Sequence, residues 1–286
     1  AGNSIESGGN YNVVVGDDAG TAITTGDANT AVGVESLASN TTSDYNTATG
    51  YRALLSNTTG ASNTAVGGLA LDANTTGDAN VAMGVNALGA NTTANNNTAV
   101  GKDSLKVNTT GANNTAVGKS ALDACTTGGS NTALGADALS SDTLGSRNVA
   151  IGTSALEVQN FTSATNSYNV AIGFNAGAAV TTGINNTIMG GLAGDAITTA
   201  SSNTALGYFA LGGNSLASAN TAVGSGALAS HNVGSLTQTF NVAVGYDAGN
   251  AVTTGTDNTI VGGLAGDATT TGAGNTFIGK EAGSAN

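Results

Sequence analysis

A pentapeptide, Asn29-Thr30-Ala31-Val32-Gly33, recurs along this 286-residue chain and constrains its fold more than any other feature. Its Asn occurs sixteen times; thirteen of the fifteen intervals between copies are 17 residues and two are 21. A strict short period indicates a solenoid, in which each repeat contacts only its neighbours. The copies begin at Asn12, Asn29, Asn46, Asn63, Asn80, Asn97, Asn114, Asn131, Asn148, Asn169, Asn186, Asn203, Asn220, Asn241, Asn258 and Asn275.

Composition argues against several other classes of protein. Charged residues are 8% of the chain, against about a quarter in ordinary domains, while hydrophobic residues are 40%, so the chain does not resemble a disordered segment. The net charge of −12 argues against nucleic-acid binding, which depends on Lys and Arg. The single Cys125 excludes an internal disulfide. No apolar run approaches the about 20 residues of a membrane span.

The positions of the repeat are numbered from its Asn. Position 5 is Gly in every copy, position 2 is Thr or Val, and position 4 is apolar except at Thr49. Because side chains alternate along a strand, we expect positions 2 and 4 to face the core and position 3 to face outward. Position 8 is Ala or Ser and position 9 is Leu or Gly, before a polar corner such as Asn57-Thr58-Thr59-Gly60, which predicts a second short strand.

The expected fold is therefore all-β: a parallel β-solenoid (β-roll or β-helix) of about 16 coils of 17 residues. We expect residues 1–286 to form a single solenoid, with a partial first coil at 1–11 and sixteen repeats at 12–286. Four extra residues lie within each of the segments 157–168 and 229–240, where corner insertions are expected.

Positions 9 and 12 vary together. Leu54 is paired with Asn57, whereas Gly194 is paired with Ile197, and Gly266 with Thr269 is an exception. Because interiors are close-packed, a missing Leu leaves a void that a neighbour must fill. We therefore expect positions 9 and 12 to reach the same interior volume across a bend.

Self-association is expected along the apolar position 3, since contiguous exposed apolar surface marks interfaces. Similar sequences at the two ends also suggest end-to-end contacts, through Ala1, Gly2, Ile5, Ala282 and Gly283, or a fragment of a longer protein. The expected stripe comprises Ala31, Ala65, Ala82, Ala99, Ala116, Ala133, Ala150, Ala171, Ile188, Ala205, Ala222, Ala243, Ile260 and Phe277.

The segments Asn148-Val149-Ala150-Ile151-Gly152 and Asn169-Val170-Ala171-Ile172-Gly173 resemble the repeat core of trimeric autotransporter adhesin heads, which are left-handed parallel β-rolls. The Asn-Thr-Ala-Val-Gly copies are equally similar to repeats of phage tail fibres. The resemblance implies a left-handed coil, side-by-side trimers, a location outside the cell, on its surface or on a virion, and an adhesive or structural role.

Few residues suggest chemistry. No cluster of His, Cys or carboxylates has metal-ligand spacing, so no catalytic, metal or cofactor site is expected. His231 is expected to be an insertion-loop residue and Cys125 a substituted corner residue, whereas the position-1 Asn residues should form a hydrogen-bonded ladder. Asn-x-Thr sequons mark candidate glycosylation sites at Asn40, Asn57, Asn74, Asn91 and Asn108.

Three functions remain open. The first is a non-enzymatic extracellular fibre, adhesin shaft or tail-fibre segment that self-assembles end to end or as a trimer. The second is ice binding through files of Thr, such as the Thr58-Thr59 corner pair and its equivalents. The third is binding of a glycan by the insertion loops, which deletion of Gln159–Thr162 and Gly234–Thr237 would abolish. The expected partners are further copies of the chain or a host-surface glycan or protein, with no nucleic acid and no membrane span.

Overall fold

The structure is a computed structural model that describes residues 9–284. These residues form an all-β parallel β-solenoid of about 16 coils, with roughly 17 residues per turn and no helix. Two compact units are distinguished: unit 1 is Ala1–Ser146 with Thr162–Ala164, and unit 2 is Arg147–Phe161 with Thr165–Asn286. The predicted fold class is confirmed.

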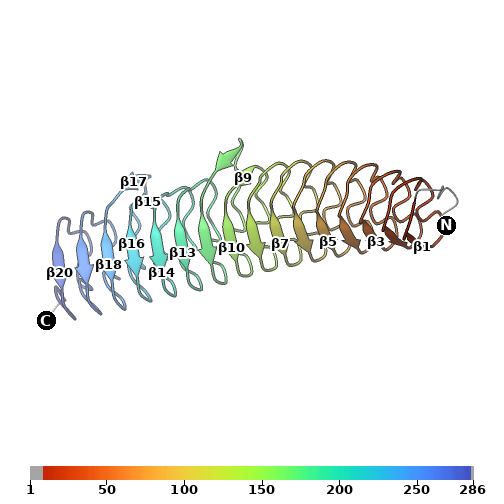
Figure 1. Ribbon diagram of the computed structural model, residues 1–286. Coiled ribbons are helices and arrows are strands. Elements are labelled where there is room, and N and C mark those ends of the chain that lie inside the picture. Colours follow the sequence, from red (N-terminus) through yellow and green to blue (C-terminus); the bar gives the residue numbers. More distant parts are fainter. Residues whose placement is uncertain (1–8, 285–286) are drawn as a thin grey trace. The chain divides into compact units, whose positions relative to one another are not determined.

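In unit 1 each coil contributes one three-residue strand to a parallel sheet, and the strands lie side by side in chain order (Figure 1). Equivalent positions pair without a shift, so that Ala31 faces Ala48 and Thr30 faces Thr47. The strands are β1 (Val13–Val15), β2 (Thr30–Val32), β3 (Thr47–Thr49), β4 (Thr64–Val66), β5 (Val81–Met83), β6 (Thr98–Val100), β7 (Thr115–Val117) and β8 (Thr132–Leu134), with the short β9 (Gly145–Ser146) at a corner.

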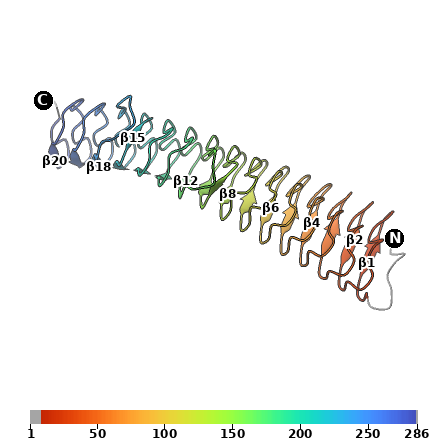
Figure 2. The same ribbon diagram turned by 90° about the horizontal axis from the view of Figure 1, so that it is seen from above.

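Unit 2 repeats this arrangement, and its coils follow one another in the same regular way when seen from above (Figure 2). Its corner strand β15 (Ala217–Ser218) pairs in parallel with β17 (Thr237–Gln238) of the second insertion. The other strands are β10 (Val149–Ile151), β11 (Thr165–Asn166), β12 (Val170–Ile172), β13 (Thr187–Met189), β14 (Thr204–Leu206), β16 (Thr221–Val223), β18 (Val242–Val244), β19 (Thr259–Val261) and β20 (Thr276–Ile278).

The main strands face the opposite way to the prediction. Ala99 at position 3 is fully buried, whereas its neighbours Thr98 and Val100 are half-exposed. The interior of a 17-residue coil is narrow, and fully buried Leu105 and Asn108 already occupy it. Only a small side chain fits opposite them, so Ala turns inward and the β-branched residues lie on the outer surface.

The predicted second strand is also wrong. Positions 7 and 9 adopt left-handed backbone conformations, for example Glu35 at φ 56° and Leu37 at φ 51°, and the segment is a series of turns. Its backbone groups still pair between coils: Glu35 N donates to Asp17 O at 2.8 Å and Leu37 N donates to Ala53 O at 3.0 Å. The stack thus satisfies the backbone without a second sheet.

The predicted exchange between positions 9 and 12 is confirmed. A Cβ on Gly20 would lie 3.0 Å from Ile23 Cδ1 and 3.1 Å from Val14 Cγ2, so all three positions share one volume. At the exception, Gly266, the same volume is filled from position 3, by Ile260 and Phe277, each of which would lie 3.2 Å from a Cβ on this glycine. Position 3 therefore takes part in the exchange.

The Gly at position 5 is required by close approach of the coils. At Gly67 φ is +135°, and a Cβ would lie 2.6 Å from the carbonyl oxygen of Gly84 in the next coil. Any larger residue would therefore force the backbones apart.

Candidate functional site

The expected self-association stripe lies inside the coils and is not a surface. Its members are fully buried, except Phe277, which is half-buried in the last described coil. The correction applies to Ala31, Ala65, Ala82, Ala99, Ala116, Ala133, Ala150, Ala171, Ile188, Ala205, Ala222, Ala243, Ile260 and Phe277, which sequence reasoning assigned to the wrong face.

The surface that the strands present is formed by positions 2 and 4, and we call it the outer sheet face. In unit 1 it carries two parallel files, one mainly of Thr and one of aliphatic residues, such as Thr98 beside Val100. Strands lie about 4.8 Å apart and alternate residues about 6.7 Å apart, so the side chains form a regular two-dimensional array. Unit 2 presents the same two files from β10 to β20.

This face is uncharged. No Asp, Glu, Lys or Arg occupies positions 1 to 5 of any repeat. The charged residues lie elsewhere on the coil, as in the ion pair between Arg52 Nε and Glu35 Oε2 at position 7. Among the described residues, the position-2 threonine hydroxyls have no protein hydrogen-bond partner, so they are free to bond water.

The corner Thr residues differ in this respect. At position 13 most Thr hydroxyls bond to the next coil: Thr58 Oγ1 donates to Thr75 O at 3.0 Å and Thr75 Oγ1 donates to Thr92 O at 3.0 Å. These hydroxyls therefore already bond the neighbouring coil, even where the residue is exposed, as at Thr58. Only the second Thr of each corner pair, such as Thr59 and Thr76, is exposed with a free side chain.

The expected Asn ladder at position 1 is confirmed. Asn46 Oδ1 accepts the backbone N–H of Asn63 at 3.0 Å, and Asn63 Nδ2 donates to Gly77 O at 2.8 Å. A second, unforeseen ladder runs along position 12, where Asn74 Nδ2 donates to Asn57 Oδ1 at 2.8 Å. These amides are fully buried, so in the folded coil the expected glycosylation positions Asn40, Asn57, Asn74, Asn91 and Asn108 are inaccessible.

Cys125 interrupts the second ladder. It takes the place of an Asn at position 12, and the buried Asn108 Oδ1 before it has no hydrogen-bond partner. Burial, together with the nearby Asp142 carboxyl, raises the pKa of the Cys125 thiol to about 12. A thiol that stays protonated is a poor nucleophile, so Cys125 is a structural residue.

His231 lies in the insertion segment and outside any strand, as expected, but its side chain enters the interior. It occupies position 12 and is fully buried, with Nε2 lying 3.0 Å from Thr239 Oγ1 and 3.4 Å from Asn241 Nδ2. Its Nδ1 has no partner, and burial lowers the pKa of the imidazole. The sequence does contain a signal for this placement, because His231 lies eleven residues after Asn220 and so falls at position 12 of its repeat.

The other 21-residue repeat is built alike. Gln159 replaces His231, and its Oε1 accepts a hydrogen bond from Asn169 Nδ2 at 2.7 Å. In both repeats a hydroxyl two residues before the next Asn bonds the Asn ladder: Ser167 Oγ donates to Asn148 Oδ1, and Thr239 Oγ1 donates to Asn220 Oδ1, each at 2.8 Å. Insertion of four residues therefore leaves the ladder intact.

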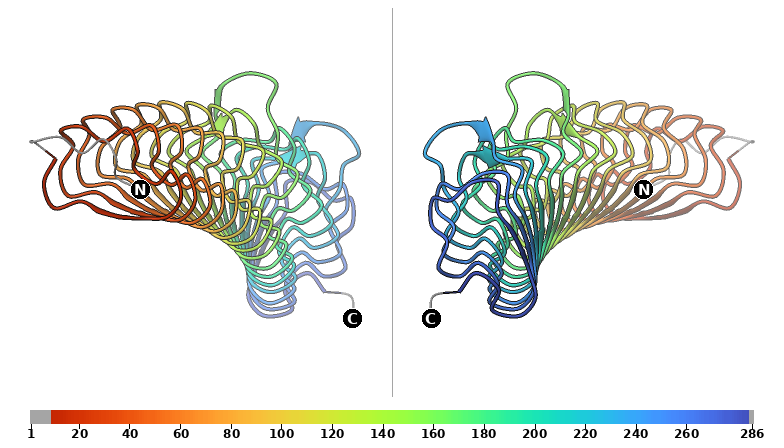
Figure 3. Two further views of the ribbon diagram at one scale, coloured as in Figure 1. Left: turned by 90° about the vertical axis from the view of Figure 1, so that its right-hand side faces the viewer. Right: turned by 90° about the vertical axis from the view of Figure 1, so that its left-hand side faces the viewer.

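The second insertion, residues 229–240, stands out beyond the neighbouring coils of unit 2 as the blue loop in Figure 3. Residues 234–238 are all exposed, and Leu236 and Gln238 line a hollow of about 300 Å³ with Ser201 and Ser218. The hollow is small and has no charged residue in its lining.

Of the expected end contacts, Ala1, Gly2 and Ile5 lie outside the described residues. Ala282 is half-buried, and its carbonyl accepts a hydrogen bond from Gly266 N at 2.8 Å. Gly283 is exposed, and its place is fixed by the Phe277 ring, which a Cβ would overlap.

Within residues 9–284, no group of three or more His, Cys, Asp or Glu side chains is placed to hold a metal ion. The same residues include no helix long and apolar enough to cross a membrane. No family model, curated protein or solved structure matches the chain.

Proposed function

We propose that the protein is a non-enzymatic ice-binding solenoid whose contact surface is the outer sheet face. The observation that supports this function is the uncharged, in-register array of Thr and aliphatic side chains on successive strands. Oxygen atoms in ice repeat on a length scale similar to the strand and side-chain spacings of a β-sheet. An array of this kind matches many lattice positions at once.

The chemistry of the two files suits this role. Each free Thr hydroxyl offers a hydrogen-bond donor and acceptor to water, and the Thr methyl and Val groups order water around them without binding it strongly. β-branched side chains have restricted χ1 rotamers, so little conformational entropy is lost on contact. The backbone beneath them is held by hydrogen bonds to both neighbouring coils, as at Thr98, whose N–H donates to Asn114 O at 2.8 Å.

The face used differs from the one expected from sequence. The corner pairs were expected to form the Thr file, but half of their hydroxyls bond the next coil. Position 2 instead supplies a file whose hydroxyls are free.

A mid-face substitution tests the proposal. Thr98→Tyr places a bulky ring in the array of unit 1 and should remove most thermal hysteresis and inhibition of ice recrystallisation. Thr93→Tyr, at an exposed corner position, is the matched control and should retain both activities. Absence of any activity in the wild-type protein at micromolar concentration, or equal activity of the two variants, would refute ice binding.

Self-association as a structural or adhesive fibre is the second candidate, favoured by the aliphatic file at position 4. Met83 and Leu134 are 44% and 46% exposed, and exposed apolar surface marks interfaces. The resemblance to adhesin heads and tail fibres points the same way. Val100→Lys should then dissociate oligomers in sedimentation, whereas a wild-type protein that stays monomeric at high concentration would exclude this role.

A further inference from the structure

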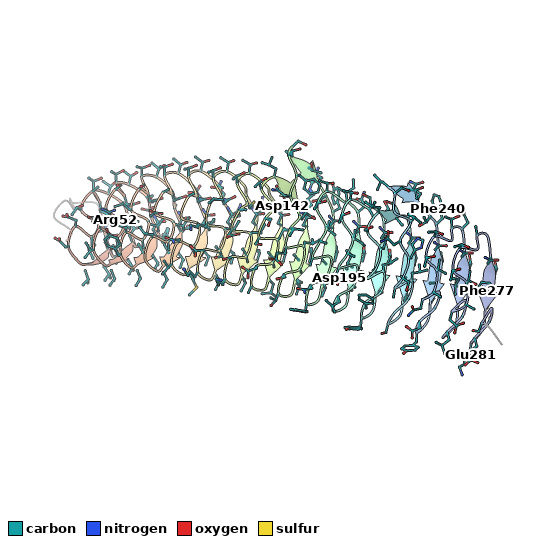
Figure 4. All side chains as sticks on the ribbon, turned by 180° about the vertical axis from the view of Figure 1, so that it is seen from behind. Arg52, Asp142, Asp195, Phe240, Phe277 and Glu281 are labelled. Carbon is teal, nitrogen blue, oxygen red and sulfur yellow. The ribbon has the colours of Figure 1, made fainter. Side chains whose placement is uncertain are left out.

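Unit 2 carries a file of aromatic residues on the edge of the coil next to the outer sheet face. Phe174, Tyr208 and Tyr246 occupy position 6 of alternate coils, and each is about three-fifths exposed (58%, 60% and 62%). The coils between them carry Gly191 and Ser225 at the same position. Glu281, labelled in Figure 4, lies at position 7 of the last described coil and marks this edge of the unit.

The spacing of the file is set by the backbone. Two coils correspond to about 9.6 Å, and each coil is fixed by hydrogen bonds to its neighbours beside position 6. Phe209 N donates to Gly191 O at 3.1 Å, and Asp247 N donates to Ser225 O at 2.9 Å. The aromatic residues are thus held at regular intervals on a rigid support.

The small residues at position 6 of the intervening coils, Gly191 and Ser225, leave the surface between the aromatic rings unobstructed. A Cβ on Gly191 would lie 3.7 Å from Tyr208 Cδ2, so the Tyr208 ring reaches back over Gly191 along the surface. Phe209 supports this ring from one side, with ring centroids 6.4 Å apart. A larger residue at position 6 of the intervening coils would separate the rings and interrupt the file.

We propose that this file binds an extended, uncharged β-1,4-linked polysaccharide by stacking sugar rings on Phe174, Tyr208 and Tyr246. The two-coil spacing is close to the length of one disaccharide in such a chain, so each aromatic residue meets an equivalent sugar face. Aromatic faces pack against the apolar C–H faces of sugars, while polar neighbours bond the hydroxyl groups. Polar groups are present: the Asp247 carboxyl is next to Tyr246 in the chain and accepts a hydrogen bond from Asn250 Nδ2 at 3.0 Å.

Charge favours a neutral polymer over an acidic one. The chain has a net charge of −12, and unit 2 has few cations, among them Arg147, whose guanidinium bonds the Tyr168 hydroxyl. The proposed site is separate from the outer sheet face, and its binding is independent of ice binding.

The test is retention of the full chain on microcrystalline cellulose and on chitin, with titration of cellohexaose and chitohexaose by calorimetry. Tyr208→Ala should lower the affinity about two- to twelvefold, since an aromatic contact contributes about 0.5–1.5 kcal/mol. Tyr208→Trp should retain binding. Tyr51→Ala removes an equally placed residue of unit 1, which lacks an aromatic neighbour two coils away, and should leave affinity unchanged.

Each outcome of this test bears on the proposal. Failure of the wild-type protein to bind either polysaccharide, or equal binding by Tyr208→Ala, overturns it. Self-association that Tyr208→Ala abolishes, without polysaccharide binding, assigns the file to a second copy of the chain and also overturns it. Ice assays on the same variants should be unchanged, which keeps the two proposals distinguishable.

Discussion

Gly194 and Ile197 occupy one interior volume: a Cβ on Gly194 would lie 2.8 Å from Ile197 Cδ1. The backbone does not itself require Gly at this position, because Leu211, the equivalent residue of the next coil, adopts φ 53° against 50° for Gly194. Packing therefore decides between Gly and Leu at position 9.

A double-mutant cycle at this pair should show strong coupling. Gly194→Ala alone should destabilise the protein because its Cβ overlaps Ile197, and Ile197→Ala alone should cost about 2–5 kcal/mol through the cavity it leaves. In the double variant the new Cβ enters that cavity, so we expect a favourable coupling of about 0.5–3 kcal/mol. Urea unfolding of the four proteins measures it, and additive effects would contradict the shared volume.

The same pair shows which parts of the fold could be predicted from the sequence. The 17-residue period predicts the coils, and the exchange between positions 9 and 12 predicts which side chains meet inside them. Period-two alternation, however, does not say which face of a three-residue strand is buried. Sequence reasoning placed the β-branched residues of positions 2 and 4 inside, although in most coils the narrow interior admits only Ala, such as Ala99, from this strand.

A signal for the correct face was present. Position 3 departs from Ala only at Val14, Ile188, Ile260 and Phe277, and each of these coils has Gly at position 9. Because position 3 is larger than Ala only in coils where position 9 has shrunk to Gly, position 3 must reach the same interior. The left-handed conformation of Leu37 and its equivalents had no such signal, because the stack imposes it against the local preference of Leu.

The break in the second Asn ladder at Cys125 predicts a stabilising substitution. Cys125→Asn supplies the side-chain N–H that Asn108 Oδ1 lacks, and relief of one unsatisfied buried acceptor should stabilise the fold by about 1 kcal/mol. Adding Asp142→Asn continues the second ladder into the next coil and should raise the stability further. Thermal unfolding compares these variants with Cys125→Ala, which offers no donor; a Cys125→Asn variant no more stable than Cys125→Ala would contradict the ladder's role.

The thiol itself should be unreactive and should destabilise the fold in alkali. With a pKa of about 12 against an ordinary value of 9.0, the folded protein holds the thiol proton where the unfolded chain releases it. The free energy of unfolding should therefore fall as pH rises above about 9. In Cys125→Ala, which has no thiol, this part of the pH dependence should be absent. At pH 8, iodoacetamide should modify Cys125 quickly in urea and hardly at all in buffer; fast alkylation of the native protein would contradict its burial.

His231 should make stability sensitive to mild acid. Burial lowers its pKa, so the folded state binds the proton less readily than the unfolded chain, and stability is lost as pH falls through the ordinary value of 6.5 and below. Gln159 performs the same task in the other 21-residue repeat without titrating. His231→Gln should therefore fold normally and remove this part of the pH dependence.

The measurement is the free energy of urea unfolding at pH 7.5 and at pH 5.5 for wild type and His231→Gln. Carboxyl groups such as Asp195, whose pKa is raised by burial, contribute equally to both proteins, so the difference between the two isolates the imidazole. We expect wild type to lose more stability than His231→Gln over this interval, because its charged ring would have no partner at Nδ1. An equal loss of unfolding free energy in the two proteins would contradict this prediction, because it would show that burial of His231 does not make stability depend on its protonation.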